Sequence, residues 1–239
     1  MNLILQALHD IPSTHLDHLA KLAQGGRFEQ VAGHAYRLAE ARAHPEIAPY
    51  CLANRIDYGF VPRGRKLADF GLVVMDMDST LISIECIDEI ADMQGLKPQV
   101  AAITEAAMRG EIDFSESLRR RVALLEGLDE HALQRVYDER LRLNPGAEIM
   151  LAKLKEHGIR TLLVSGGFLF FTERLKPRLG LDFTHANTLE IAGGKLTGKV
   201  LGNILDAQGK ADWLVKTREE LGLGPEQVIA MGDGANDLK

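Results

Sequence analysis

The chain has 239 residues, of which 46% are hydrophobic, so it is long enough to bury a substantial core in one large domain or two. Its formal net charge of −6 argues against a nucleic-acid-binding surface, because phosphate backbones require clustered lysine and arginine. It has no apolar run of about 18 residues, no signal-peptide pattern at the N-terminus and only two cysteines. We therefore expect a cytoplasmic protein with reduced cysteines that binds neither nucleic acid nor membrane.

The first 70 residues predict a small α+β domain. Residues 3–8 are apolar and predict a strand, residues 14–23 predict a helix, and the rest of the segment reads as loops rich in glycine and proline. His15 and His18 share a helix face, but no third metal ligand lies nearby in the sequence. We expect residues 1–70 to be an accessory domain, with contact in a homodimer or metabolite sensing as its candidate roles.

The first sign of chemistry is the stretch VVMDMDSTL at residues 73–81, in which a short apolar run ends in Asp76 and Asp78. Such a run predicts a buried strand, and open α/β sheets place their ligands at the carboxyl ends of strands. Residues two apart on an extended segment point the same way, so both carboxylates can reach one small volume. Like charges at that distance are costly, which suggests bound Mg²⁺, a shared proton, or both.

Residues from about 84 to 142 are almost wholly helical in pattern. Their apolar positions recur at steps of three and four, with breaks at Gly95–Pro98, Gly110–Asp113 and Gly127–Asp129. We expect a helical cap inserted after the first strand, which closes over a substrate and excludes water.

The remaining chain predicts an α/β fold. A helix over 145–158, a strand over 161–164 and a helix over 168–179 follow one another, and residues 185–206 predict a hairpin rather than a phosphate-binding loop. Strand and helix in alternation predict a doubly wound, Rossmann-like parallel sheet with right-handed crossovers. We therefore divide the chain into the N-terminal domain and a core over 71–239 that carries the cap.

Three later polar clusters accompany the aspartate pair. They are SGG after the apolar run TLLV, a lysine at a predicted helix start, and GDGAND after a second apolar run. Their polar members and glycines are Ser165, Gly166, Gly167, Lys210, Asp233, Asn236 and Asp237. Backbone N–H groups beside glycine can approach an anion closely, and carboxylates suit a hard metal ion. Together with the first pair, these clusters predict a site that needs a metal, a nucleophile and a phosphate.

In this order and spacing, the four clusters resemble the motifs of the haloacid dehalogenase-like phosphohydrolases, and most closely those of the phosphoserine phosphatases. DMDST is similar to the family's DxDST motif, SGG to its second motif, Lys210 to its third and GDGAND to its fourth, over residues 72–238. The resemblance implies Mg²⁺-dependent hydrolysis of O-phospho-L-serine through an aspartyl-phosphate, the last step of serine biosynthesis. Two alternatives stay open: a related phosphomonoesterase or phosphotransferase, and a non-enzymatic metabolite-binding regulator on the same fold.

The resemblance also implies a role for each motif residue. Asp76 would be the nucleophile, Asp78 the acid that protonates the leaving oxygen and then the base for water, and Lys210 a positive charge at the phosphoryl group. The implied phosphate contacts are Ser165, Gly166 and Asn236. The implied Mg²⁺ ligands are Asp76, Asp233 and the backbone carbonyl of Asp78, with Asp237 acting through water or by orienting Lys210.

Within the expected cap, four residues sit where the phosphoserine enzymes carry substrate contacts: Glu85, Met108, Phe114 and Arg121. Arg121 would bind the carboxylate of the amino acid, Glu85 would hold its ammonium, and the two apolar residues would wall the pocket. The plainer alternative is that Glu85 and Arg121 form a weak surface ion pair and that Met108 and Phe114 belong to a core.

The chain stops at Lys239, directly after GDGANDL. By resemblance a further helix and strand would follow, which needs roughly 30 residues. We expect either a fragment or a fold that is completed in another way, and an unfinished sheet edge beside the site.

Overall fold

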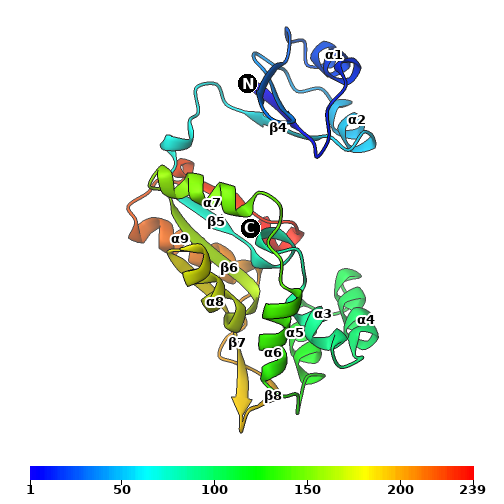
Figure 1. Ribbon diagram of the computed structural model, residues 1–239, viewed down its shortest axis with the longest axis vertical. Coiled ribbons are helices and arrows are strands. Elements are labelled where there is room, and N and C mark those ends of the chain that lie inside the picture. Colours follow the sequence, from blue (N-terminus) through cyan, green and yellow to red (C-terminus); the bar gives the residue numbers. More distant parts are fainter. The chain divides into compact units, whose positions relative to one another are not determined.

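The computed structural model describes all residues from Met1 to Lys239 and divides into two compact units, Met1–Leu67 and Ala68–Lys239. Figure 1 shows both units, with the first in blue and cyan. None of the helices combines the length and the apolar character that a membrane span requires.

The first unit is a four-stranded antiparallel sheet with two helices, in the order βαββαβ. Its elements are β1 (Asn2–Gln6), α1 (Ser13–Leu22), β2 (Glu29–Ala32), β3 (Ala35–Leu38), α2 (Ile47–Ala53) and β4 (Asp57–Val61). The spatial order of the strands is β2-β3-β1-β4. Leu3 and Leu5 of β1 are fully buried and join residues of α1 and α2 in one core, because alternate residues of a strand share a face.

The sequence predicted only the first strand and the first helix of this unit. The segment expected to form loops instead contains β2, β3, α2 and β4. All four residues of β2 are exposed, so the strand lacks the apolar alternation that predicts a strand. The helix α2 has only seven residues and contains Pro49 in its first turn, where proline is tolerated.

The second unit is an α/β fold around a five-stranded sheet, as the sequence predicted. Its strands are β5 (Leu72–Met75), β6 (Arg160–Phe168), β7 (Phe183–Ala192), β8 (Lys195–Leu201) and β9 (Val228–Met231), in the spatial order β8-β7-β6-β5-β9. All neighbouring pairs are parallel except the β7–β8 hairpin. The chain moves outward from β5 to β7 and then returns to place β9 on the other side of β5. This reversal of direction is where doubly wound folds bind ligands.

Helices cover both faces of this sheet. They are α7 (Ala147–Glu156), α8 (Leu169–Leu179) and α9 (Ala207–Glu220). Leu72 and Val74 of β5 pack with Trp213 and Leu214 of α9, while all four residues of β5 are buried. A strand that is covered on both faces reads as a continuous apolar run, which is why β5 was legible in the sequence.

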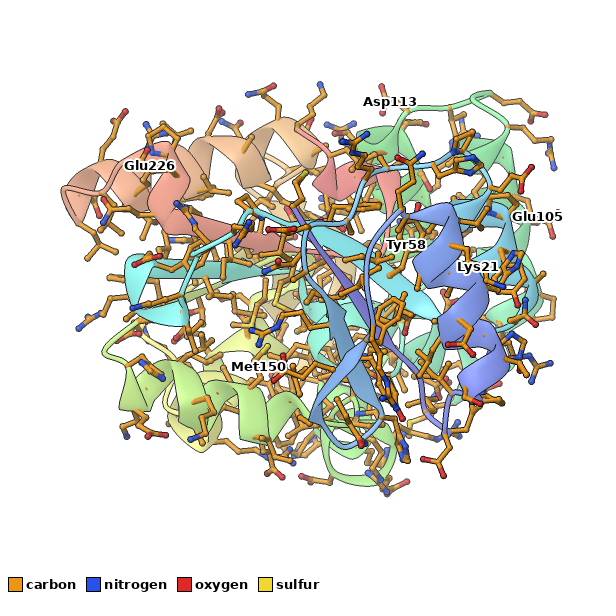
Figure 2. The ribbon with its side chains drawn as sticks, turned by 90° about the horizontal axis from the view of Figure 1, so that it is seen from above. Lys21, Tyr58, Glu105, Asp113, Met150 and Glu226 are labelled. Carbon is orange, nitrogen blue, oxygen red and sulfur yellow. The ribbon has the colours of Figure 1, made fainter.

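A group of helices lies between β5 and β6 in the chain and forms a separate cluster beside the sheet in Figure 1. Its elements are α3 (Cys86–Asp92), α4 (Lys97–Met108), α5 (Phe114–Ala123), α6 (His131–Arg135) and the helical turn η3 (Val136–Arg140). Two of the three interruptions expected from the sequence, Gly110–Asp113 and Gly127–Asp129, fall between these helices. The third, Gly95–Pro98, was wrong at its end, because α4 begins at Lys97 and holds Pro98 in its first turn, where proline is tolerated. Asp113, labelled in Figure 2, caps α5 by accepting a hydrogen bond from the N–H of Glu116 at 2.7 Å.

The two chain segments that connect this helical group to the sheet run side by side. Ile82 pairs with Leu143 in an antiparallel bridge, and the N–H of Ser83 donates to the carbonyl of Arg142 at 2.9 Å. The β7–β8 hairpin also contacts the group, because the N–H of Gly127 donates to the carbonyl of Leu196 at 2.8 Å.

Candidate active site

The polar clusters of the sequence meet at the carboxyl ends of three adjacent strands. Asp76 directly follows β5, Ser165 lies near the end of β6, and Asp233 follows β9. Lys210 reaches the same place from the first turn of α9. Because β5, β6 and β9 are parallel neighbours, their ends share one edge of the sheet.

Ser165 was expected at a strand tip, whereas β6 continues to Phe168. The pairing of β6 with β7 shifts in register between Val164 and Phe168. This irregularity keeps the segment in the sheet while turning Gly166 and Gly167 toward the site.

Lys210 forms ion pairs with two carboxylates at this edge of the sheet. Its ammonium lies 2.7 Å from a carboxylate oxygen of Asp76 and 2.8 Å from one of Asp237. Burial raises the pKa of Asp76, and the Lys210 charge opposes that rise. The position of Asp237 agrees with the expected role of orienting Lys210.

Three carboxylates, those of Asp76, Asp233 and Asp237, offer oxygen atoms that lie within 4.8 Å of one another. Lys210 pairs with Asp76 and Asp237 but not with Asp233, so negative charge remains for a cation to balance. Carboxylate oxygens are the donors that a hard divalent cation prefers. The residues therefore fit a metal ion, and Asp237 belongs to the acidic cluster itself and not only to its surroundings.

Asp78 lies beside this cluster and is held from two sides. The N–H of Cys86 donates to one of its carboxylate oxygens at 2.9 Å, and the Ser165 hydroxyl lies 3.4 Å from the other. Desolvation, followed by the charge of Glu85, raises the pKa of Asp78 to about 7. A carboxylic acid with such a pKa can both give and take a proton near neutral pH.

Ser165, Gly166 and Gly167 of β6 line a cavity together with Asp78. The Ser165 hydroxyl is fully buried and accepts a hydrogen bond from the N–H of Gly167 at 2.9 Å. A Cβ atom on Gly167 would lie 2.6 Å from an Asp78 carboxylate oxygen, so a larger residue there would have to displace that carboxylate.

All but one of the predicted site residues line a single cavity of about 420 Å³. They are Asp76, Asp78, Glu85, Met108, Phe114, Arg121, Ser165, Gly166, Lys210, Asp233 and Asn236. Only Asp237 is not among the lining residues, because it lies behind Lys210. Residues 114 to 121 of α5 thus share a cavity with strand ends that lie far away in the sequence.

Glu85 and Arg121 do not pair with each other. Glu85 accepts a hydrogen bond from the Ser79 hydroxyl at 2.6 Å, and the Arg121 Nε donates to the carbonyl of Ser117 at 3.4 Å. Met108, at 83% exposed, and Phe114, at 36%, line the cavity without belonging to a core. Besides the aspartates and Lys210, the cavity is therefore lined by an acidic and a basic side chain that do not neutralise each other.

Sequence reasoning missed three polar residues that support the site. The Asn187 amide donates to the Gly166 carbonyl at 2.8 Å and accepts from the N–H of Leu205 at 2.7 Å. The Thr80 hydroxyl donates to Asp233 at 3.2 Å, and Asn144 contacts the loop after β5. Thr80 stands inside the DMDST motif, which was a usable signal. Nothing in the local sequence marks the two asparagines.

Comparison with known proteins agrees with this geometry. Residues 73–239 match the haloacid dehalogenase-like hydrolase family, and residues 3–47 match a domain of unknown function (DUF4072). A phosphoserine phosphatase from Polaromonas sp. is 56% identical over 178 residues, which cover 72% of this chain and 75% of the relative.

Solved structures extend the similarity over nearly the whole chain. A HAD family hydrolase from Salmonella enterica serovar Typhi matches with a TM-score of 0.84 at 33% identity, covering 99% of this chain and 84% of the other. A probable phosphoserine phosphatase from Vibrio cholerae matches with a TM-score of 0.79 at 36% identity, covering 99% and 74%. Since the family match spans more than half of the residues and includes the strand ends described above, the chain belongs to the haloacid dehalogenase-like hydrolase family.

Proposed function

We propose that this enzyme hydrolyses O-phospho-L-serine to L-serine and inorganic phosphate with the help of Mg²⁺. The observation that carries the proposal is the shared cavity, which is lined by an aspartate pair, by a lysine, and by Glu85 and Arg121, whose opposite charges do not pair with each other. The name of the Polaromonas relative supports the same substrate. A zwitterionic amino acid is the ligand that such opposed charges would select.

In the first half of the reaction, a carboxylate oxygen of Asp76 attacks phosphorus and the bond from phosphorus to the serine oxygen breaks. Asp78 gives its proton to that leaving oxygen, a role that suits its pKa of about 7. Lys210, the Ser165 hydroxyl and the Gly166 N–H stabilise the negative charge on the transferring group, and Asn236 contacts the phosphate.

In the second half, Asp78 takes a proton from water, and the water oxygen attacks phosphorus of the aspartyl-phosphate. The bond from phosphorus to Asp76 breaks, which frees inorganic phosphate and restores the carboxylate. Asp78 has then regained the proton that it gave away, so protons balance over the full cycle.

Mg²⁺ would be held by Asp76, Asp233 and the backbone carbonyl of Asp78, with Asp237 nearby. When bound, it neutralises the repulsion between an anionic nucleophile and an anionic substrate. The proposal of Mg²⁺ over a softer metal is supported by the all-oxygen donor set.

For the amino-acid end of the substrate, Arg121 would bind the carboxylate bidentately and Glu85 the ammonium. Met108 and Phe114 would form the apolar wall of the pocket and so limit the size of the substrate that fits there. In this proposal residues 84–142 act as a cap that excludes water, and residues 1–70 form an accessory domain. The role of this accessory domain in a homodimer and the cytoplasmic location of the protein stay predictions.

The test is phosphate release from L-phosphoserine with and without Mg²⁺, for the unmodified chain and for Asp76→Asn. We expect metal-dependent turnover that the substitution abolishes, and much weaker turnover of sugar and nucleotide phosphates. Turnover of another phosphomonoester alone, or transfer of phosphate to an alcohol, would replace the proposed substrate or acceptor. A folded chain that releases no phosphate from any of them would favour a regulator.

A further inference from the structure

The side chain of Asn144 is surrounded by backbone carbonyls of the loop that follows β5. Its amide nitrogen lies 2.8 Å from the carbonyl oxygen of Thr80 and 3.3 Å from those of Ser79 and Ile82. All three neighbours are acceptors, so the amide must present its N–H₂ group to them. Its backbone N–H donates to the carbonyl of Leu81 at 3.0 Å, which fixes it to the same loop. Asn144 thus gathers a loop that lies more than 60 positions earlier in the chain.

The loop that Asn144 holds contains an unfavourable backbone conformation. Ser79 has a φ of 55°, in the left-handed region that residues with a Cβ atom rarely adopt. Such a conformation costs on the order of 1 kcal/mol and persists only where surrounding contacts enforce it. Two contacts do so here: the Ser79 carbonyl accepts from Asn144, and its N–H donates to the carbonyl of Ile84 at 3.2 Å.

The conformation of Ser79 aims its hydroxyl at Glu85. The hydroxyl donates to a Glu85 carboxylate oxygen at 2.6 Å, and Glu85 lines the cavity that Arg121 also lines. Glu85 is itself exposed, and the Ser79 hydroxyl is the group that holds its carboxylate by a hydrogen bond. A long, exposed carboxylate without such a contact would sample several rotamers and lose entropy when it binds a ligand.

We propose that Asn144 is a positioning residue for substrate selection, acting through Ser79 on Glu85. It lies on the segment that returns from the helical group to α7, and it holds Ser79 in the left-handed conformation in which its hydroxyl fixes the Glu85 carboxylate. The ligand of Glu85 is the ammonium of phosphoserine, so this inference rests on the function proposed above.

The test compares phosphoserine with 3-phosphoglycerate, which carries a hydroxyl in place of the ammonium. We would measure kcat and KM for both substrates with the unmodified chain, Asn144→Ala, the isosteric Asn144→Asp, and Ser79→Ala. Asn203→Ala is the matched control, because Asn203 is exposed and lies in the connection between β8 and α9. Thermal unfolding shows whether each variant is folded.

We expect the preference for phosphoserine, taken as the ratio of kcat/KM, to fall by roughly three- to tenfold in all three site variants, mainly through KM. The Asn203 variant should keep the ratio. In the Ser79→Ala background, Asn144→Ala should cause no further loss, because the two residues act in one chain of contacts.

An unchanged ratio in folded Asn144 variants, or full additivity with Ser79→Ala, would overturn the role of Asn144 while leaving the proposed function intact. An unmodified chain that does not turn over phosphoserine would overturn both. A loss of stability alone does not mimic the expected result, because it lowers the activity toward both substrates equally. If Asn144→Ala does not fold, Ser79→Ala tests the same link to Glu85.

Discussion

Replacing Lys210 by methionine tests the charge balance beneath the site. Lys210 is 8% exposed at its side chain and lies 2.7 Å from Asp76, which is also 8% exposed. Unit charges at that separation attract by about 6 kcal/mol at an effective dielectric constant of about 20. The cost of removing both groups from water offsets part of this attraction. Measured losses on breaking buried pairs are about 3–5 kcal/mol, and we expect Lys210→Met to cost about 3 kcal/mol of unfolding free energy.

The loss should depend on pH with a definite sign. Lys210 opposes the rise in the pKa of Asp76, so the variant raises that pKa further. A carboxyl group with a raised pKa in the folded state is tolerated while it is protonated and destabilises the fold as the pH rises through that pKa. The deficit should therefore be larger at about pH 8 than at about pH 5. Added Mg²⁺ should recover part of it, because a cation bound only by the folded state stabilises that state.

The assay is urea unfolding in the presence of a chelator, at both pH values, followed by a Mg²⁺ titration. Lys216→Met is the control, since Lys216 lies on the same helix, is exposed and stacks on Trp213 with its ammonium 4.4 Å from the ring centre. That variant should change the unfolding free energy by less than about 1 kcal/mol at either pH. A Lys210→Met deficit as small as the control's, or one that shrinks as the pH rises, would refute the reasoning.

Three further predictions follow from the same contacts. Gly167→Ala should lower kcat on the order of a hundredfold with little change in expression, because the added Cβ would displace the Asp78 carboxylate. Unchanged kinetics would contradict the close approach of Gly167 to Asp78. Arg121→Lys should raise KM for phosphoserine by roughly tenfold or more, since an ammonium cannot replace bidentate binding; an unchanged KM would exclude Arg121 from substrate binding. His185 stacks on Trp213 with 3.4 Å between ring centres, and burial lowers the pKa of His185. The contribution of neutral His185 to the unfolding free energy is therefore full above the ordinary histidine pKa of 6.5 and is lost as the pH falls through the lowered pKa. The urea midpoint of the unmodified chain should therefore fall as the pH is lowered below 6.5, and it should fall less in His185→Gln. An equal fall in the unmodified chain and the variant would assign the effect to other groups.

The α/β fold was predictable, as was the sheet edge that carries the polar residues, because three of the four polar clusters follow an apolar run. Asp76 directly follows β5, whose four residues are all buried, and Asp233 follows the apolar residues of β9 after one glycine. Parallel strands bring such positions to one edge whatever their separation in sequence. A local pattern together with one topological rule was therefore sufficient to bring Asp76 and Asp233 to one edge of the sheet. The cap residues had no such signal, and only the family resemblance pointed to them.

After β1, the strands of the first unit escaped prediction for the opposite reason. In β4 no residue is fully buried, and in β2 every residue is exposed, so neither shows a clear apolar alternation. What places them is pairing with β1 and β3, whose register depends on contacts across the sheet. Propensity is a weak guide where tertiary pairing decides the structure.

Asn144 and Asn187 support the site from outside its four motifs, and nothing in the local sequence identifies them. Each amide donates to backbone carbonyl groups far away in the sequence. Asn144 reaches the loop after β5, more than 60 residues away, and Asn187 reaches Gly166 in β6, 21 residues away. Both act on backbone of a motif, the first on the DMDST loop and the second on SGG. The motifs thus identify the residues that supply the functional groups of the proposed site. The backbone conformation that orients those groups depends on side chains outside the motifs. A chain that kept all four motifs but lost these two amides should therefore retain the chemistry while losing the precision with which Glu85 and Gly166 are aimed.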